Sequence, residues 1–135
     1  MSESAAICLY VADRYSPAVL APAIDDPRRG KFLYWLMYTP AVVEPAMSEK
    51  FNQVESNRGR SGWGDFETMI ATWDNGLQGS DWILGDQFTA ADVMLGSSAV
   101  FLRMFDMLPE TANIGAYADR CLERPAYKRA LAESG

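Results

Sequence analysis

The sequence from residue 84 to residue 108 reads LGDQFTAADVMLGSSAVFLRMFDML, and it predicts the helix around which the rest of the chain is organised. Thr89 is followed three residues later by Asp92, a spacing that lets the hydroxyl accept from the Asp92 amide while the carboxylate accepts from the Thr89 amide. Phe88 precedes this capping box and can pack on Val93 as a hydrophobic staple. These signals predict that a helix begins at Thr89.

This helix is expected to lie in the core of the domain. Large apolar residues follow one another in nearly every direction around it, and Arg103 is the one charged residue between Asp92 and Asp106. A helix that is apolar all round is typically buried. The small residues at positions 96–99 would let a neighbouring helix approach closely.

The composition predicts a single domain and excludes several classes of function. With 135 residues, of which 49% are apolar, the chain can bury a core of its own. Twelve basic and eighteen acidic residues give a net charge of -6, which repels the phosphate backbone of nucleic acids. No apolar run reaches the roughly 18 residues of a membrane span, and no signal peptide is recognisable. We expect a cytoplasmic protein that binds neither nucleic acid nor membrane.

The sequence offers no residue for common acid–base or metal chemistry. It contains no histidine, which is the commonest general base and zinc ligand. Cys8 and Cys121 are far apart in helical patterns, so we expect two reduced thiols rather than a disulfide framework or a metal site. No catalytic residue is assigned within the chain.

The remaining sequence predicts further helices and no strand. Ser4 is expected to cap the first of them, and Asp26 the second, in which Pro27 would take the first position. Pro40 and Pro45 are expected to kink or interrupt this second helix. The predicted helices besides the central one cover residues 4–15, 27–57, 65–77, 114–122 and 125–131. The fold class is therefore all-α, with about six helices and no sheet.

Three segments resemble the cytosolic glutathione S-transferases, particularly the bacterial ones. WILGDQFTAAD at 82–92 resembles the start of the central helix in that family's C-terminal domain, and YADRCLERPAYKRA at 117–130 resembles its last two helices. ESAAICLYVA at 3–12 resembles the end of the family's thioredoxin-like N-terminal domain. The resemblance implies a division into 1–16, the last helix of the thioredoxin-like domain, and 17–135, the helical domain of the family.

The resemblance also implies a glutathione site at Glu3 and Ser4. In the family these two positions hold the γ-glutamyl end of glutathione, so Ser4 would bind its carboxylate and Glu3 its amino group. The residue types suit these roles, because a helix N-terminus binds anions and a carboxylate pairs with an ammonium. The alternative is that Ser4 only caps its own helix.

For the hydrophobic co-substrate, the resemblance implies a pocket on the inner face of the second helix. Its large polarisable side chains are Tyr34, Trp35, Met37 and Tyr38, and the alternative for each is ordinary core packing. Met104 and Phe105 of the central helix are further candidates. Phe88, Thr89 and Asp92 are structural under either interpretation.

The function implied by the resemblance is conjugation of the glutathione thiolate to hydrophobic electrophiles. The chain itself lacks the strands and the thiol-activating residue of the thioredoxin-like domain, and Cys8 lies inside a helix rather than at that residue's position. We therefore expect the 135 residues alone to be inactive. Glutathione is expected as a co-substrate of the intact protein, with no other cofactor.

A second interpretation is a non-catalytic helical module that binds other proteins. In both interpretations the helix over residues 4–15 lacks the sheet on which Ile7, Tyr10 and Val11 would pack. Leaving them in water costs roughly 1.5–3 kcal/mol for each large side chain. We therefore expect a homodimer or other self-association.

Overall fold

The chain folds into helices without a sheet, in a computed structural model that describes residues 2–109 and 112–133. Over these ranges the backbone pairs of strand type are two isolated bridges, Pro17–Ala21 and Trp82–Gly85. The elements are α1 (Ser4–Tyr15), α2 (Arg29–Tyr38), η1 (Thr39–Val43), α3 (Glu44–Phe51), α4 (Phe66–Gly76), α5 (Ala90–Met104), α6 (Ala112–Glu123) and α7 (Pro125–Glu133). Because α2, η1 and α3 follow one another without a break, the described residues form six helical segments. The predicted all-α class is confirmed.

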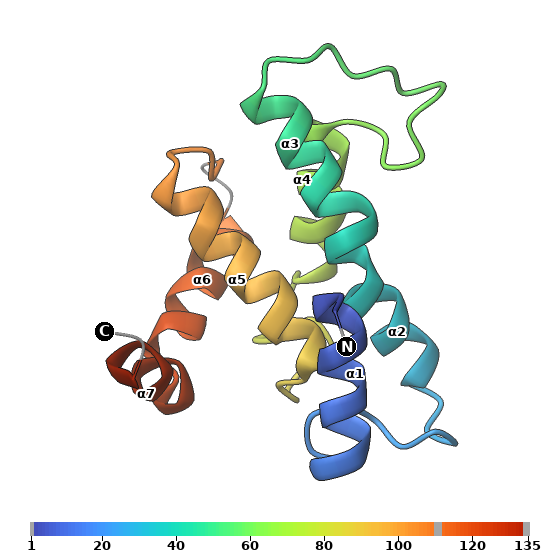
Figure 1. Ribbon diagram of the computed structural model, residues 1–135, viewed down its shortest axis with the longest axis vertical. Coiled ribbons are helices and arrows are strands. Elements are labelled where there is room, and N and C mark those ends of the chain that lie inside the picture. The colour runs from blue at the N-terminus through green and yellow to red at the C-terminus, as the bar shows by residue number, and fades with distance from the viewer. Residues whose placement is uncertain (1, 110–111, 134–135) are drawn as a thin grey trace.

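The helix formed by α2, η1 and α3 runs diagonally through the molecule beside α5, and α1 lies between α5 and α2 (Figure 1). α2 packs across α5, and α1 lies against both of them. α3 runs beside α4, while α6 packs on α4 and α5 and carries α7 at its end.

The second helix passes through both of its prolines instead of stopping at them. Around Pro40 the backbone forms the π-helical turn η1, in which the amide of Glu44 donates to the carbonyl of Thr39. A π turn shifts the hydrogen-bonding register and so accommodates the missing amide of a proline. The helix begins at Arg29, two residues later than predicted, and ends at Phe51, before the predicted Asn57.

The central helix α5 is buried over most of its length and exposed mainly at its end. Leu95, Ala99 and Leu102 are fully buried, as predicted for a core helix. Phe101 and Met104 are exposed, so the prediction is wrong for these two residues of the last turn. The predicted close approach of a neighbouring helix at positions 96–99 is made by α6.

The predicted capping box at the start of α5 is present. The amide and the hydroxyl of Thr89 donate to Oδ2 of Asp92 at 2.8 and 3.1 Å. The Ile83 amide and the Tyr117 hydroxyl donate to Oδ1 at 2.9 and 3.0 Å. Burial raises the pKa of Asp92, while these hydrogen bonds favour the ionised form. The carboxylate thus joins the start of α5 to the preceding loop and to α6.

Phe88 contacts more than the first turn of α5. Its ring packs edge-on against Trp82 with centroids 4.9 Å apart, and the guanidinium of Arg124 lies 3.4 Å from its centroid. Val93, its predicted staple partner, is exposed. Phe88 therefore connects the start of α5 to the junction of α6 and α7.

The core lies between α2, α4, α5 and α6. Its largest fully buried side chains are Trp73, Tyr117, Phe32, Leu36, Met69, Leu77, Ile83, Leu95, Leu102 and Ile114. In the described part of the chain no helix is long and apolar enough to cross a membrane.

Candidate functional site

The N-terminus of α1 carries the two residues predicted to bind glutathione. Glu3, not Ser4, is the N-cap, with φ 64° and ψ 104°, and its side chain makes no capping hydrogen bond. The prediction that Ser4 caps the helix is therefore wrong, since Ser4 is the first helical residue. Both side chains are exposed. The first helical hydrogen bond runs from the Ile7 amide to the Glu3 carbonyl at 3.0 Å, so the amides at residues 4–6 point out of the helix end.

The direction of α1 brings this helix end toward the later turns of α5. The loop after α1 meets the start of α5, where the Ala90 amide donates to the Leu20 carbonyl at 2.7 Å. One turn further along α5, Met94 Sδ lies 3.8 Å from Cys8 Sγ in the middle of α1. α1 therefore runs antiparallel to α5, and continuing from Cys8 to Ser4 leads toward the turn of α5 that follows Met94.

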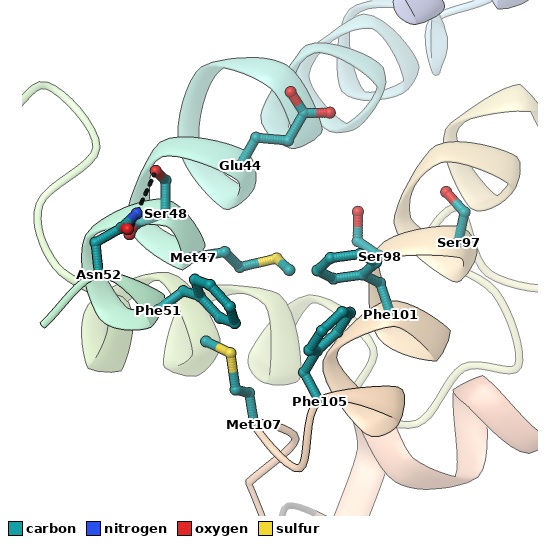
Figure 2. A pocket seen from close by; sticks show the side chains of 10 residues that line it. All are labelled: Glu44, Met47, Ser48, Phe51, Asn52, Ser97, Ser98, Phe101, Phe105 and Met107. Carbon is teal, nitrogen blue, oxygen red and sulfur yellow. Dashed lines mark hydrogen bonds between the residues drawn. The ribbon is translucent and has the colours of Figure 1, made fainter.

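That turn borders a cavity of about 470 Å³ between α3 and α5 (Figure 2). Its centre is apolar: the rings of Phe101 and Phe105 lie 4.5 Å apart, and Phe51 meets Phe105 edge-on at 5.7 Å between centroids. In Figure 2 the Glu44 carboxylate and the Ser97 hydroxyl lie at the border, while Ser98 stands beside the Phe101 ring. The described lining residues are Glu44, Met47, Ser48, Phe51, Asn52, Ser97, Ser98, Phe101, Phe105 and Met107.

The four pocket candidates of the second helix lie elsewhere. Trp35 and Tyr38 are buried toward α4, where the Tyr38 hydroxyl donates to the Met69 carbonyl at 3.1 Å and burial raises its pKa to about 12. Tyr34 and Met37 are exposed. None of the four lines the cavity between α3 and α5, and their role in a co-substrate pocket stays a prediction.

Of the two further candidates, Phe105 lines the cavity and Met104, 75% exposed, does not. Sequence reasoning missed Met47, Phe51 and Phe101. The first two follow Pro45, where a kink or interruption of the helix was expected, and Phe101 was assigned to the core. Met47 and Phe51 continue the apolar spacing of the second helix past Pro45. That spacing indicates a shared helix face only if the helix is continuous through the proline.

Neither cysteine is placed to act as a nucleophile. Burial raises the pKa of the half-buried Cys8 thiol. Burial and the neighbouring charge of Asp92 raise the pKa of Cys121 to about 12. Because the thiolate is the nucleophilic form, both thiols are expected to be weak nucleophiles near neutral pH.

Comparison with known proteins decides the family. Residues 20–130 match the family model described as "Glutathione S-transferase, C-terminal domain". The chain belongs to this family. No curated protein matched the chain. The resemblance recognised in the sequence is thereby confirmed for the helical domain.

Solved structures of glutathione S-transferases have the same fold as this domain. A ternary complex of BphK, a bacterial glutathione S-transferase, has 25% sequence identity and a TM-score of 0.81, and the match covers 98% of this chain and 68% of that chain. A sphingomonad glutathione S-transferase complexed with glutathione has 27% identity and a TM-score of 0.75, covering 98% and 67%. A glutathione transferase from Methylococcus capsulatus, at 23% identity and TM-score 0.82, supports the fold alone. The chain spans about two thirds of the length of each.

Proposed function

We propose that the chain is the helical portion of a glutathione transferase that conjugates glutathione to hydrophobic electrophiles. The adjacency of two features carries this proposal: the free N-terminus of α1 points toward the turn of α5 that borders the cavity. A glutathione held by its γ-glutamyl end at Glu3 and Ser4 could extend toward an electrophile bound between α3 and α5.

Each group in this arrangement has a defined proposed role. The amides at residues 4–6 and the Ser4 hydroxyl would bind the glutamyl carboxylate, while Glu3 would bind the ammonium group. The cavity would exclude water from the apolar co-substrate. We further propose that residues 1–16 belong to a thioredoxin-like domain and 17–135 to the helical one. The group that lowers the pKa of the glutathione thiol would come from the thioredoxin-like domain.

Glutathione binding by the chain tests the first half of the proposal. Titration of the ¹⁵N-labelled chain should shift the amide resonances of residues 4–6 before others. Glu3→Gln and Ser4→Ala should each weaken this binding. Glu55→Gln, which neutralises an exposed glutamate in the loop after α3, is the matched control and should bind like the original chain. Equal binding by Glu3→Gln, Ser4→Ala and the original chain would contradict the site.

A turnover assay tests whether the chain itself can activate the glutathione thiol. Since the thiol-activating group is proposed to lie outside these residues, the purified chain should not accelerate the reaction of glutathione with a chloro-nitro-aromatic electrophile. Measurable turnover in a preparation free of other transferases would show that the 135 residues supply the activating group themselves.

One observation favours a protein-binding module as the second candidate function. Ile7, Tyr10 and Val11 form an apolar face on α1 and are 40%, 49% and 41% exposed. This face suits either a thioredoxin-like domain or another protein. Binding of another protein to this face, together with no binding of glutathione at residues 4–6, would favour the module. Self-association through the face is also expected, and a strictly monomeric chain at high micromolar concentration in sedimentation would argue against that.

A further inference from the structure

One border of the cavity carries a free negative charge. Among the described residues that line it, Glu44 is the one with a charged side chain. The ion pairs found in the described part of the chain do not include Glu44, and its side chain is exposed. In Figure 2 its carboxylate, on α3, points toward the same side of the cavity as the hydroxyls of Ser97 and Ser98, on α5. This border is therefore available to a ligand.

The two serines cannot donate hydrogen bonds to a ligand without breaking their own. Ser97 Oγ donates to the Met94 carbonyl at 2.8 Å, and Ser98 Oγ donates to the same oxygen at 3.3 Å. A serine hydroxyl has a single proton, so both oxygens can only accept from the cavity side. Together with the Glu44 carboxylate they form a border of acceptors, which calls for a ligand group that donates.

The centre of the cavity suits a flat apolar ring of a ligand. The ring of Phe105 packs against Phe101 at 4.5 Å and against Phe51 at 5.7 Å between centroids. Offset and edge-on packing of a further ring is favourable at such separations, and the faces of these rings also attract a cation. The volume of about 470 Å³ is within the range of small-molecule sites.

We infer that this cavity prefers aromatic ligands that carry a protonated amine, and that Glu44 determines the preference. The ring of the ligand packs among Phe51, Phe101 and Phe105, and its ammonium group donates to Glu44 and to Ser98. The inference rests on the proposed function, because it names the chemical class of the hydrophobic co-substrate.

Three naphthalenes of similar size test this directly: 2-naphthylmethylamine, 2-naphthylmethanol and 2-naphthoate. Their Kd values for the full chain are measured by NMR titration at neutral pH. The amine should bind about fivefold tighter than the alcohol, and the naphthoate should bind weakest. Added salt should reduce the preference for the amine without affecting the alcohol.

Substitutions of Glu44 test whether this residue determines the preference for the amine. Glu44→Gln should make the amine and the alcohol bind equally, and Glu44→Lys should reverse the order in favour of the naphthoate. Glu55→Gln removes an equal charge away from the cavity and should preserve the original order. Because Glu44 is exposed, circular dichroism should show unchanged helix content in all variants.

The outcomes separate this inference from the proposed function. Equal binding of amine and alcohol by the original chain, or a preference that survives Glu44→Gln, overturns the inference. If Phe105→Ala then still weakens binding of both ligands, the cavity keeps its proposed role as the co-substrate site. If none of the three naphthalenes binds, the inference and the assignment of the cavity both fail.

Discussion

Gly96 of α5 and Cys121 of α6 lie so close that a Cβ atom added to Gly96 would be 2.6 Å from the Cys121 sulfur. Gly96→Ala should therefore destabilise the chain, although alanine favours a helix. Overpacking costs about 1–3 kcal/mol, against about 1 kcal/mol gained in helix propensity. The free energy of unfolding in urea should fall by up to about 2 kcal/mol.

Removing the sulfur gives a control for this explanation. In Cys121→Ala the nearest atom to the new methyl group is the Cβ of residue 121 at 3.4 Å, which is ordinary contact. Gly96→Ala in that background should be neutral or stabilising by up to about 1 kcal/mol. If the two substitutions instead add without coupling, the helix contact is not what requires glycine at position 96.

The capping carboxylate should matter more than the capping hydroxyl. Asp92→Ala leaves the buried donors of Ile83, Thr89 and Tyr117 without their acceptor, and each unsatisfied group costs about 1–3 kcal/mol. Thr89→Ala should cost only about 1 kcal/mol, as for a typical cap. Urea unfolding should rank the variants in this order. Similar losses for both would mean that Asp92 acts through the cap alone.

The capping residues were recognisable in the sequence because their interactions are local. Thr89 and Asp92 are three residues apart, and that spacing alone determines their hydrogen bonds in a helix. The additional donors of Asp92 come from Ile83 and Tyr117. The Tyr117 contact depends on how α6 packs on α5, which no local pattern specifies. The start of the helix could thus be predicted from the sequence, but the hydrogen-bond network around the Asp92 carboxylate could not.

The cavity could not be predicted for a related reason. Its walls come from α3 and α5, and α3 continues the second helix without a break past Pro40 and Pro45. Proline in a helical pattern kinks or interrupts it, so the sequence did not predict a regular helix face that continues past Pro45. Phe101 was predicted to be buried because every direction around α5 is apolar, but packing covers only part of it.

Acid should weaken the start of α4 through Asp65. This N-cap accepts from the Thr68 amide at 2.8 Å and pairs with Arg58, and both interactions lower the pKa of its carboxyl. A lowered pKa in the folded state means that the stabilisation is complete above the ordinary value of about 3.8 and is lost as pH falls through the folded value. The stability of the chain should accordingly drop below about pH 4.

Two variants isolate this contribution. Asp65→Asn keeps a capping acceptor but cannot ionise, so its difference in unfolding free energy from the original chain should shrink steadily below about pH 4. Arg58→Ala leaves the cap in place and should remove only part of the pH dependence. A difference between Asp65→Asn and the original chain that is constant from pH 2 to 6 would contradict the ion pair.

The two thiols should differ in their rates of chemical labelling. Cys121 is buried under α5 and its pKa is raised to about 12, so the thiolate is scarce and shielded. Cys8 is half-buried and should react faster. In Ellman's assay at pH 8 the native chain should give two phases, of which Cys8→Ser removes the faster and Cys121→Ser the slower. In denaturant the two phases should merge, because both thiols then behave as free cysteine. A native Cys121 that reacts as quickly as the denatured one would contradict the packing of α6 against Gly96.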